Sequence, residues 1–86
     1  MQVLITGASG GIGFAIADYF ASAGHKVILA DVNQQALDSK VAALRAKGAD
    51  AEAILLDVTD SAAIERCGKH YQIDVLINNA GIQHVA

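Results

Sequence analysis

The hydrophobic pattern of the chain alternates between two kinds of stretch. Apolar residues recur at helical spacing in three stretches, and short continuous apolar runs separate these stretches. The runs, typical of buried β-strands, are QVLIT (2–6), KVILA (26–30), EAILLD (52–57) and DVLIN (74–78). Strands that alternate with helices in this way predict right-handed βαβ units around a parallel sheet. We therefore expect an α/β fold.

The helical stretches carry start and stop signals. Gly24 and Gly48 are placed to end the first two helices. Asn33 is placed to cap the second helix, and Thr59 or Asp60 to cap a short third one. The apolar positions that define the helical faces are Ile12, Ile16, Tyr19 and Phe20, then Leu37, Val41 and Leu44, then Ile64.

Composition restricts the class of protein. The 86 residues are 53% hydrophobic and 17% charged, which is too apolar for disorder and enough for one small domain, residues 1–86. A net charge of −3 provides no basic patch for nucleic acid. The single cysteine cannot form an internal disulfide, and we expect neither a signal peptide nor a membrane-spanning run. We expect a cytoplasmic domain that binds neither nucleic acid nor membrane.

The stretch TGASGGIG, residues 6–13, places four glycines between the first strand and the first helix. A helix N-terminus offers unpaired N–H groups and a partial positive charge, which suit a phosphate. Gly7 would permit a sharp exit from the strand, and Gly11 and Gly13 a close approach of a pyrophosphate and of the helix to the sheet. Ser9 adds a hydroxyl that either donates to a phosphate or holds the turn. The alternative is a glycine-rich turn without a ligand.

Asp31 ends the second strand, 18 residues after Gly13. A carboxylate at this position accepts hydrogen bonds from a ribose 2′-hydroxyl and repels a 2′-phosphate. Neither Gly10 nor Val32 offers a basic side chain to such a phosphate. The sequence therefore favours NAD over NADP, unless Asp31 only caps the next helix.

These residues resemble the short-chain dehydrogenases/reductases, whose T-G-x-x-x-G-x-G motif is matched by TGASGGIG. LDVTD (56–60) is similar to the family's adenine-contacting segment, and NNAG (78–81) to its fourth-strand motif, which steadies the sheet and borders the cofactor. The resemblance implies a partial Rossmann-like three-layer α/β/α fold with four parallel strands in the order 3-2-1-4. The implied cofactor contacts are Gly7, Ser9, Gly10, Gly11, Ile12, Gly13, Asp31, Asp57 (toward the adenine amine), Val58 (beside the ring), Asn79, Ala80 and Gly81.

The last residues narrow the resemblance. NNAGIQHVA (78–86) is similar to the D-3-hydroxybutyrate dehydrogenases, in which a glutamine at the position of Gln83 helps to hold the substrate carboxylate. This implies that the complete enzyme oxidises a small hydroxy acid, such as 3-hydroxybutyrate, by hydride transfer to NAD. Other family members reduce 3-oxoacyl thioesters, sugars or steroids with the same first half.

The family's catalytic serine and Tyr-x-x-x-Lys motif are not found in these 86 residues. Tyr19 is followed four residues later by Ala23, and Tyr71 by Val75. The interval from residue 57 to residue 74 is also shorter than in the family. We therefore expect no catalytic residues here and a chain that is not a competent catalyst alone.

The residues leave two alternative functions open. The first is a non-catalytic nucleotide-binding or self-associating half-domain. The second is another Rossmann class such as the methyltransferases, which the glycine spacing and NNAG disfavour. In a sheet of order 3-2-1-4, the run DVLIN would form an exposed apolar edge, which predicts self-association as a two-fold dimer. Cys67 is expected to be a small buried apolar residue, and the histidines show no metal-ligand spacing.

Overall fold

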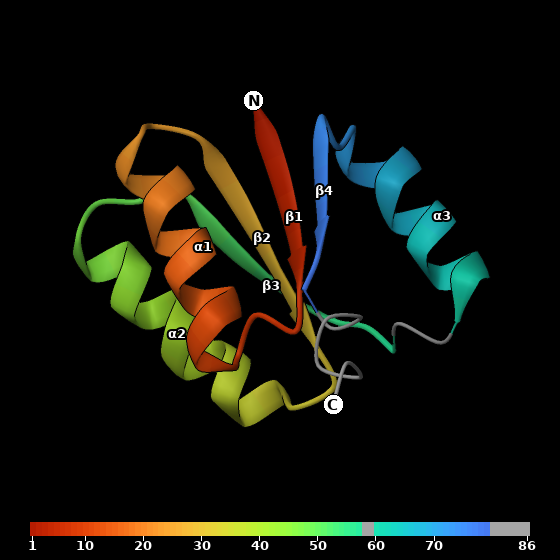
Figure 1. Cartoon of the computed structure of the whole chain (residues 1–86), viewed down its shortest axis with the longest axis horizontal. Helices are drawn as coiled ribbons and strands as arrows, with labels where there is room; N and C mark the ends of the chain where they lie inside the picture. The colour runs from red at the N-terminus through yellow and green to blue at the C-terminus, as the bar shows by residue number, and fades with distance from the viewer. Residues whose placement is uncertain (58–59, 80–86) are drawn as a thin grey trace.

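The computed structural model describes residues 1–57 and 60–79, which form four strands and three helices in strict alternation (Figure 1). In chain order the elements are β1 (Gln2–Thr6), α1 (Gly11–Ser22), β2 (Lys26–Asp31), α2 (Gln34–Ala46), β3 (Ala51–Leu55), α3 (Ser61–Tyr71) and β4 (Val75–Asn78). All paired strands are parallel, and their order is β3-β2-β1-β4. The predicted partial Rossmann-like fold is confirmed.

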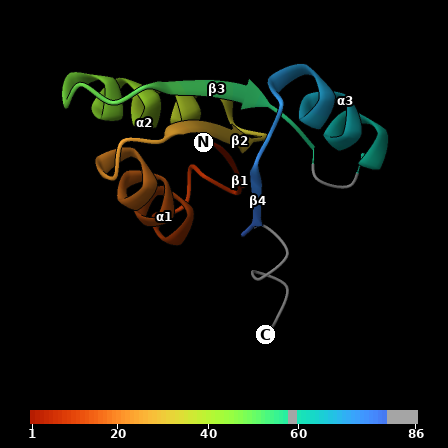
Figure 2. The ribbon, with the colours of Figure 1, turned by 90° about the horizontal axis from the view of Figure 1, so that it is seen from above.

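The helices lie on both faces of the sheet, with α1 and α2 on one side and α3 on the other (Figure 2). Alternate residues of the two central strands point to opposite sides, so each strand contributes to two cores. Val3 and Ile5 of β1 belong to the core under α1 and α2, whereas Leu4 belongs to the core under α3. This burial on both faces explains why β1 and β2 are continuous apolar runs rather than alternating ones.

The predicted helix caps are confirmed. The Asn33 side chain accepts a hydrogen bond from Ala36 N–H at 3.0 Å, and the Asp60 side chain accepts one from Ala63 N–H at 3.1 Å. Gly48 follows α2 with a φ of 87°, a left-handed conformation that glycine adopts without strain. The sequence allowed either Thr59 or Asp60 as the cap of the third helix, and in the structure the cap is Asp60.

The residues of α1 that are fully buried are smaller than those that define its apolar face. Gly13 and Ala17 are its buried residues, and these small side chains allow the helix axis to approach the strands closely. Ile12 and Tyr19 are 66% and 71% exposed. Of the four predicted apolar positions, Ile16 and Phe20 are half-buried and pack against the core under α1 and α2. A hollow along this helix is lined by Gly11, Ile12, Ala15, Ile16, Tyr19 and Phe20.

The strand pairing brings the carboxyl ends of β1, β2 and β4 together at one end of the sheet. Thr6, the last residue of β1, pairs with Ala30 near the end of β2 and with Asn78 at the end of β4. In open α/β sheets, ligands bind in the crevice at the carboxyl ends of the strands. Within residues 1–57 and 60–79, no helix is long and apolar enough to cross a membrane.

Candidate functional site

The turn between β1 and α1, residues 7–10, is fixed by backbone hydrogen bonds and is called the glycine turn below. Gly7 has a φ of 63°, in the left-handed region that favours glycine. Gly10 N–H donates to Gly7 O at 3.3 Å, and Ala8 N–H donates to Ala30 O of the neighbouring strand at 3.2 Å. The turn is therefore anchored to β2 before α1 begins.

Gly13 lies where the glycine turn, α1 and the end of β4 come into contact. A Cβ atom at this residue would overlap the Gly7 carbonyl oxygen, and it would lie 2.9 Å from both Ala8 Cα and Asn79 Nδ2. The Asn79 side chain is fully buried and donates to Gly7 O at 3.2 Å. Asn79 therefore joins the end of β4 to the glycine turn, and Gly13 leaves the space for this contact.

The N-terminus of α1 has no side-chain cap. Gly10 occupies the N-cap position, and no acidic residue lies in the first turn of the helix. The unpaired N–H groups at a helix start carry a partial positive charge, and here no side-chain carboxylate of the first turn neutralises it. Gly11 and Ile12 are exposed at this end. The arrangement suits a bound anion such as a phosphate.

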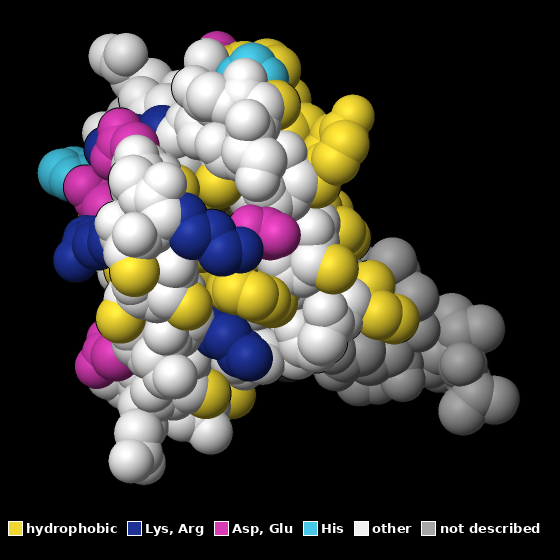
Figure 3. Space-filling model, turned by 90° about the vertical axis from the view of Figure 1, so that its left-hand side faces the viewer, with side chains coloured by type: hydrophobic (Ala, Val, Ile, Leu, Met, Phe, Trp, Pro, Cys, Tyr) yellow, Lys and Arg dark blue, Asp and Glu magenta, His cyan; other side chains and the backbone are white. Residues whose placement is uncertain are grey.

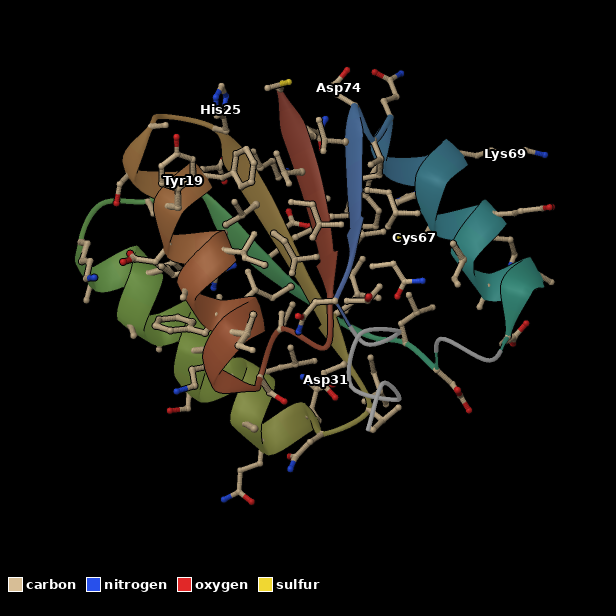
Figure 4. All side chains as sticks on the ribbon, viewed as in Figure 1. Tyr19, His25, Asp31, Cys67, Lys69 and Asp74 are labelled. Carbon is tan, nitrogen blue, oxygen red and sulfur yellow. The ribbon has the colours of Figure 1, made fainter. Side chains whose placement is uncertain are left out.

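Asp31 lies at the carboxyl end of β2, beside the chain that leaves β1 (Figure 4). Its Oδ2 accepts two hydrogen bonds from Ser9, one from the backbone N–H at 3.1 Å and one from Oγ at 2.5 Å. Its Oδ1 accepts a hydrogen bond from Val32 N–H at 2.7 Å. Since Asn33 provides the N-cap of α2, the Asp31 carboxylate is free of that role and faces the glycine turn instead.

Two opposing effects act on the pKa of Asp31. Partial burial raises it, but the Ser9 hydroxyl and the backbone N–H groups of Val32, Ser9 and Asn33 donate to the carboxylate and lower it. The hydrogen bonds prevail, so the pKa lies below the ordinary value of 3.8. Asp31 is therefore a fixed negative charge at neutral pH.

One contact at this edge was not predicted. Thr6 Oγ1 donates to Asn78 Oδ1 at 2.9 Å, which ties the last residues of β1 and β4 together. The strand order placed these two residues side by side, and a buried threonine at a strand end requires a hydrogen-bond partner. The signal in the sequence was that both polar residues stand at the ends of predicted strands.

The remaining predicted residues are distributed unevenly. Asp57 is exposed beyond the end of β3, and its carbonyl oxygen accepts a hydrogen bond from Asp60 N–H at 3.0 Å. Cys67 is buried among the residues under α3, as expected, and burial raises the pKa of its thiol. The described part of the chain contains no group of His, Cys, Asp and Glu residues able to hold a metal. Outside the described residues lie Val58, Ala80, Gly81 and Gln83.

A family model described as short chain dehydrogenase matches residues 1–86. The chain belongs to the short-chain dehydrogenase family. The match confirms the family that the glycine motif, LDVTD and NNAG indicated. The members of this family are oxidoreductases.

Curated relatives extend well beyond the length of this short-chain dehydrogenase chain. It is 47% identical over 88 residues to an uncharacterised oxidoreductase of Bacillus subtilis (strain 168), a match that covers 96% of the chain and 34% of the relative. It is 44% identical over 92 residues to gluconate 5-dehydrogenase of Gluconobacter oxydans (strain 621H), covering 99% of the chain and 35% of the relative. The chain thus spans about a third of the length of these relatives.

A solved structure of the same family carries a cofactor. It is a short chain dehydrogenase/reductase from Burkholderia phymatum in complex with NAD. The match has a TM-score of 0.75 and 39% sequence identity, and it covers 80% of this chain and 25% of that one. The fold of the short-chain dehydrogenase chain described above is therefore shared with an NAD-bound member of its family.

Proposed function

We propose that the chain is the cofactor-binding part of a nicotinamide-dependent oxidoreductase, and that it prefers NAD. The observation that carries the proposal is the Asp31 carboxylate, held beside the glycine turn at the carboxyl end of β2. A ribose hydroxyl can donate to this carboxylate, whereas a 2′-phosphate would face a fixed negative charge. The NAD-bound relative from Burkholderia phymatum supports a nicotinamide dinucleotide as the ligand, and the preference for NAD rests on Asp31.

The proposed roles follow from the placement of the residues. The pyrophosphate would lie at the N-terminus of α1, where Gly10, Gly11 and Ile12 present backbone atoms without a side-chain cap. Gly7, Gly13 and the Asn79 side chain would keep the glycine turn in the shape that admits it. On the family resemblance, we propose that Asp57 and Val58 contact the adenine and that Ala80 and Gly81 border the cofactor.

For the whole protein we propose oxidation of a small hydroxy acid by hydride transfer to NAD. Support comes from the resemblance of NNAGIQHVA to D-3-hydroxybutyrate dehydrogenases and from the role that this gives to Gln83. The relative from Gluconobacter oxydans is named for gluconate, also a hydroxy acid. Neither tyrosine of these 86 residues begins a Tyr-x-x-x-Lys motif, so we assign the chemical step to the whole protein. A cytoplasmic location stays a prediction from composition.

A second proposal concerns the sheet edge at β4. β4 pairs with β1, and no strand among the described residues pairs with its other side. Leu76, at its centre, is 50% exposed. An apolar strand with an open edge is a template for pairing with another chain, so we propose self-association through β4.

Calorimetric titration of the chain with NAD and with NADP tests the cofactor proposal. We expect saturable binding with NAD preferred by about tenfold, the scale of one charge-assisted hydrogen bond. Asp31→Asn should weaken NAD binding and reduce the preference for NAD over NADP. The control Asp50→Asn, at an exposed residue, should change neither the affinity nor the preference. Equal affinities of the unmutated chain would contradict the choice of NAD, and no binding of either dinucleotide would contradict the function.

A further inference from the structure

We propose that Ser9 is a specificity-determining residue that acts through Asp31, holding its carboxylate in place and withdrawing its own donors from the ligand. The proposal rests on the cofactor-binding function above and deepens it. It concerns a hydrogen-bonded pair whose members are 22 positions apart in the chain. The pair joins the glycine turn to the end of β2.

The geometry fixes the carboxylate at both oxygens. Ser9 N–H and Ser9 Oγ converge on Oδ2 at 3.1 and 2.5 Å, and Val32 N–H donates to Oδ1 at 2.7 Å. Hydrogen bonds to an ionised acceptor are stronger than neutral ones, so donors from two separate segments restrict rotation about the Cβ–Cγ bond. Asp31 therefore presents one orientation to a ligand instead of several. The Asp31 side chain is therefore ordered before the ligand binds, so binding a ribose costs less conformational entropy.

Ser9 has no hydrogen-bond donor left for a ligand. A serine has one backbone N–H and one hydroxyl proton, and Ser9 gives both to Asp31. Ser9 Oγ and the Asp31 carboxylate can therefore only accept hydrogen bonds from a ligand. A ribose hydroxyl can donate to them, whereas a phosphate that is ionised at neutral pH has only acceptor oxygens. Ser9 and Asp31 together form an acceptor surface that accepts a 2′-hydroxyl and rejects a 2′-phosphate.

This arrangement predicts that the effect of Ser9 depends on Asp31. With the carboxylate present, the Ser9 hydroxyl supports NAD by orienting its partner. With the carboxylate removed, the same hydroxyl is released and becomes a donor for a phosphate. A residue that only maintained the shape of the turn would affect both cofactors alike in both backgrounds.

The experiment titrates the 86-residue chain and its variants with NAD and NADP, after circular dichroism has confirmed that each variant is folded. In Ser9→Ala we expect NAD binding to weaken by about tenfold with little change for NADP. Ser9→Thr, which keeps the hydroxyl, should retain the preference for NAD, and Ser39→Ala, exposed on α2, should match the unmutated chain. In an Asp31→Ala background, Ser9→Ala should instead weaken NADP binding.

A second measurement needs no ligand. Carboxyl-carbon NMR titration of the free chain should show a higher pKa for Asp31 in Ser9→Ala than in the unmutated chain. If Ser9→Ala leaves both this pKa and the NAD-to-NADP ratio unchanged while the unmutated chain prefers NAD, the role of Ser9 is wrong and the proposed function stands. If the unmutated chain binds neither dinucleotide, both are wrong.

Discussion

At the scale of single residues, Gly13 is the position where the site tolerates least change. Three parts of the fold approach it: the Gly7 carbonyl, the Ala8 backbone and the Asn79 side chain. The first two are backbone groups that rotamer changes cannot move. A side chain at residue 13 therefore has to displace either the glycine turn or α1.

Replacing Gly13 by alanine should damage both stability and binding. We expect a loss of about 1–3 kcal/mol in the free energy of unfolding, the usual cost of forcing an extra methyl group into a packed site. Urea denaturation measures this loss, and titration with NAD should show weaker binding. Gly68→Ala is the matched control, because a Cβ there has nothing within 4 Å and should stabilise α3 by about 0.5–1 kcal/mol. Equal behaviour of the two variants would contradict the packing described for Gly13.

Asp31 predicts a dependence of stability on pH. Its pKa in the folded chain lies below 3.8, so the carboxylate stabilises the fold fully above its unfolded pKa. This stabilisation is lost as the pH falls below 3.8 and through the lower folded value. Denaturation of the unmutated chain across this range should show the loss, and Asp31→Asn should show a shallower acid dependence. Parallel pH profiles for the two proteins would argue against the hydrogen bonds assigned to Asp31.

The positions of the candidate site residues at the strand ends were readable from sequence, but their mutual contacts were not. The glycines and Asp31 stand at recognisable distances from the strand ends, because strand and helix periods locate those ends. The bond from Ser9 to Asp31 depends on how β1 and β2 are aligned and on two side-chain rotamers, neither of which leaves a local pattern. Sequence analysis therefore left the Ser9 hydroxyl open between phosphate and turn, and the structure places it on Asp31.

At the scale of elements, the helix boundaries follow from local chemistry. Asn33 and the residues Leu37, Val41 and Leu44 were enough to predict α2, because cap and periodicity agree on one helix. The orientation of α1 was predictable only in part: Gly13 was expected to bring the helix close to the sheet, whereas the burial of Ala17 was not foreseen. Its small residues Gly13 and Ala17 meet the sheet, and hydrophobic periodicity alone favours the larger side chains.

The cap of α2 provides a test at this scale. Asn33→Ala removes the acceptor for Ala36 N–H and should cost about 1 kcal/mol of stability. Thermal or urea unfolding measures this cost, and Asn33→Ser, which keeps an oxygen acceptor, should recover most of it. Since α2 buries three large side chains in the core, the loss should appear in global unfolding. An alanine variant as stable as the serine variant would mean that the cap contributes nothing.

At the scale of the whole molecule, the sheet is well covered in its centre and poorly covered toward β4. β1 and β2 are buried on both faces, whereas β4 alternates between half-buried and exposed positions. Figure 3 shows charged side chains over the left and centre of the face it draws, and hydrophobic ones both between them and along the upper right. The exposed apolar residues on α1 and β4 include Ile12, Tyr19 and Leu76. Surfaces of this kind usually contact another chain or another part of the protein.

The proposed pairing through β4 predicts the oligomeric state. At micromolar concentration the 86-residue chain should sediment as a dimer, and Leu76→Lys should shift it to a monomer, because a charge on an edge strand opposes pairing. Leu55→Lys is the control, since Leu55 is similarly exposed but lies on β3 at the opposite edge of the sheet. A monomeric unmutated chain, or equal effects of the two lysines, would contradict self-association through β4.

We expect a dinucleotide to bind where the glycine turn, the start of α1 and Asp31 meet. A proton–nitrogen correlation spectrum of the labelled chain, recorded during titration with NAD, locates the bound dinucleotide. The shifts should concentrate on the backbone N–H groups of Ser9, Gly10, Gly11 and Val32, with little change in α3. A folded chain whose spectrum does not respond to NAD, or responds mainly in α3, would contradict it.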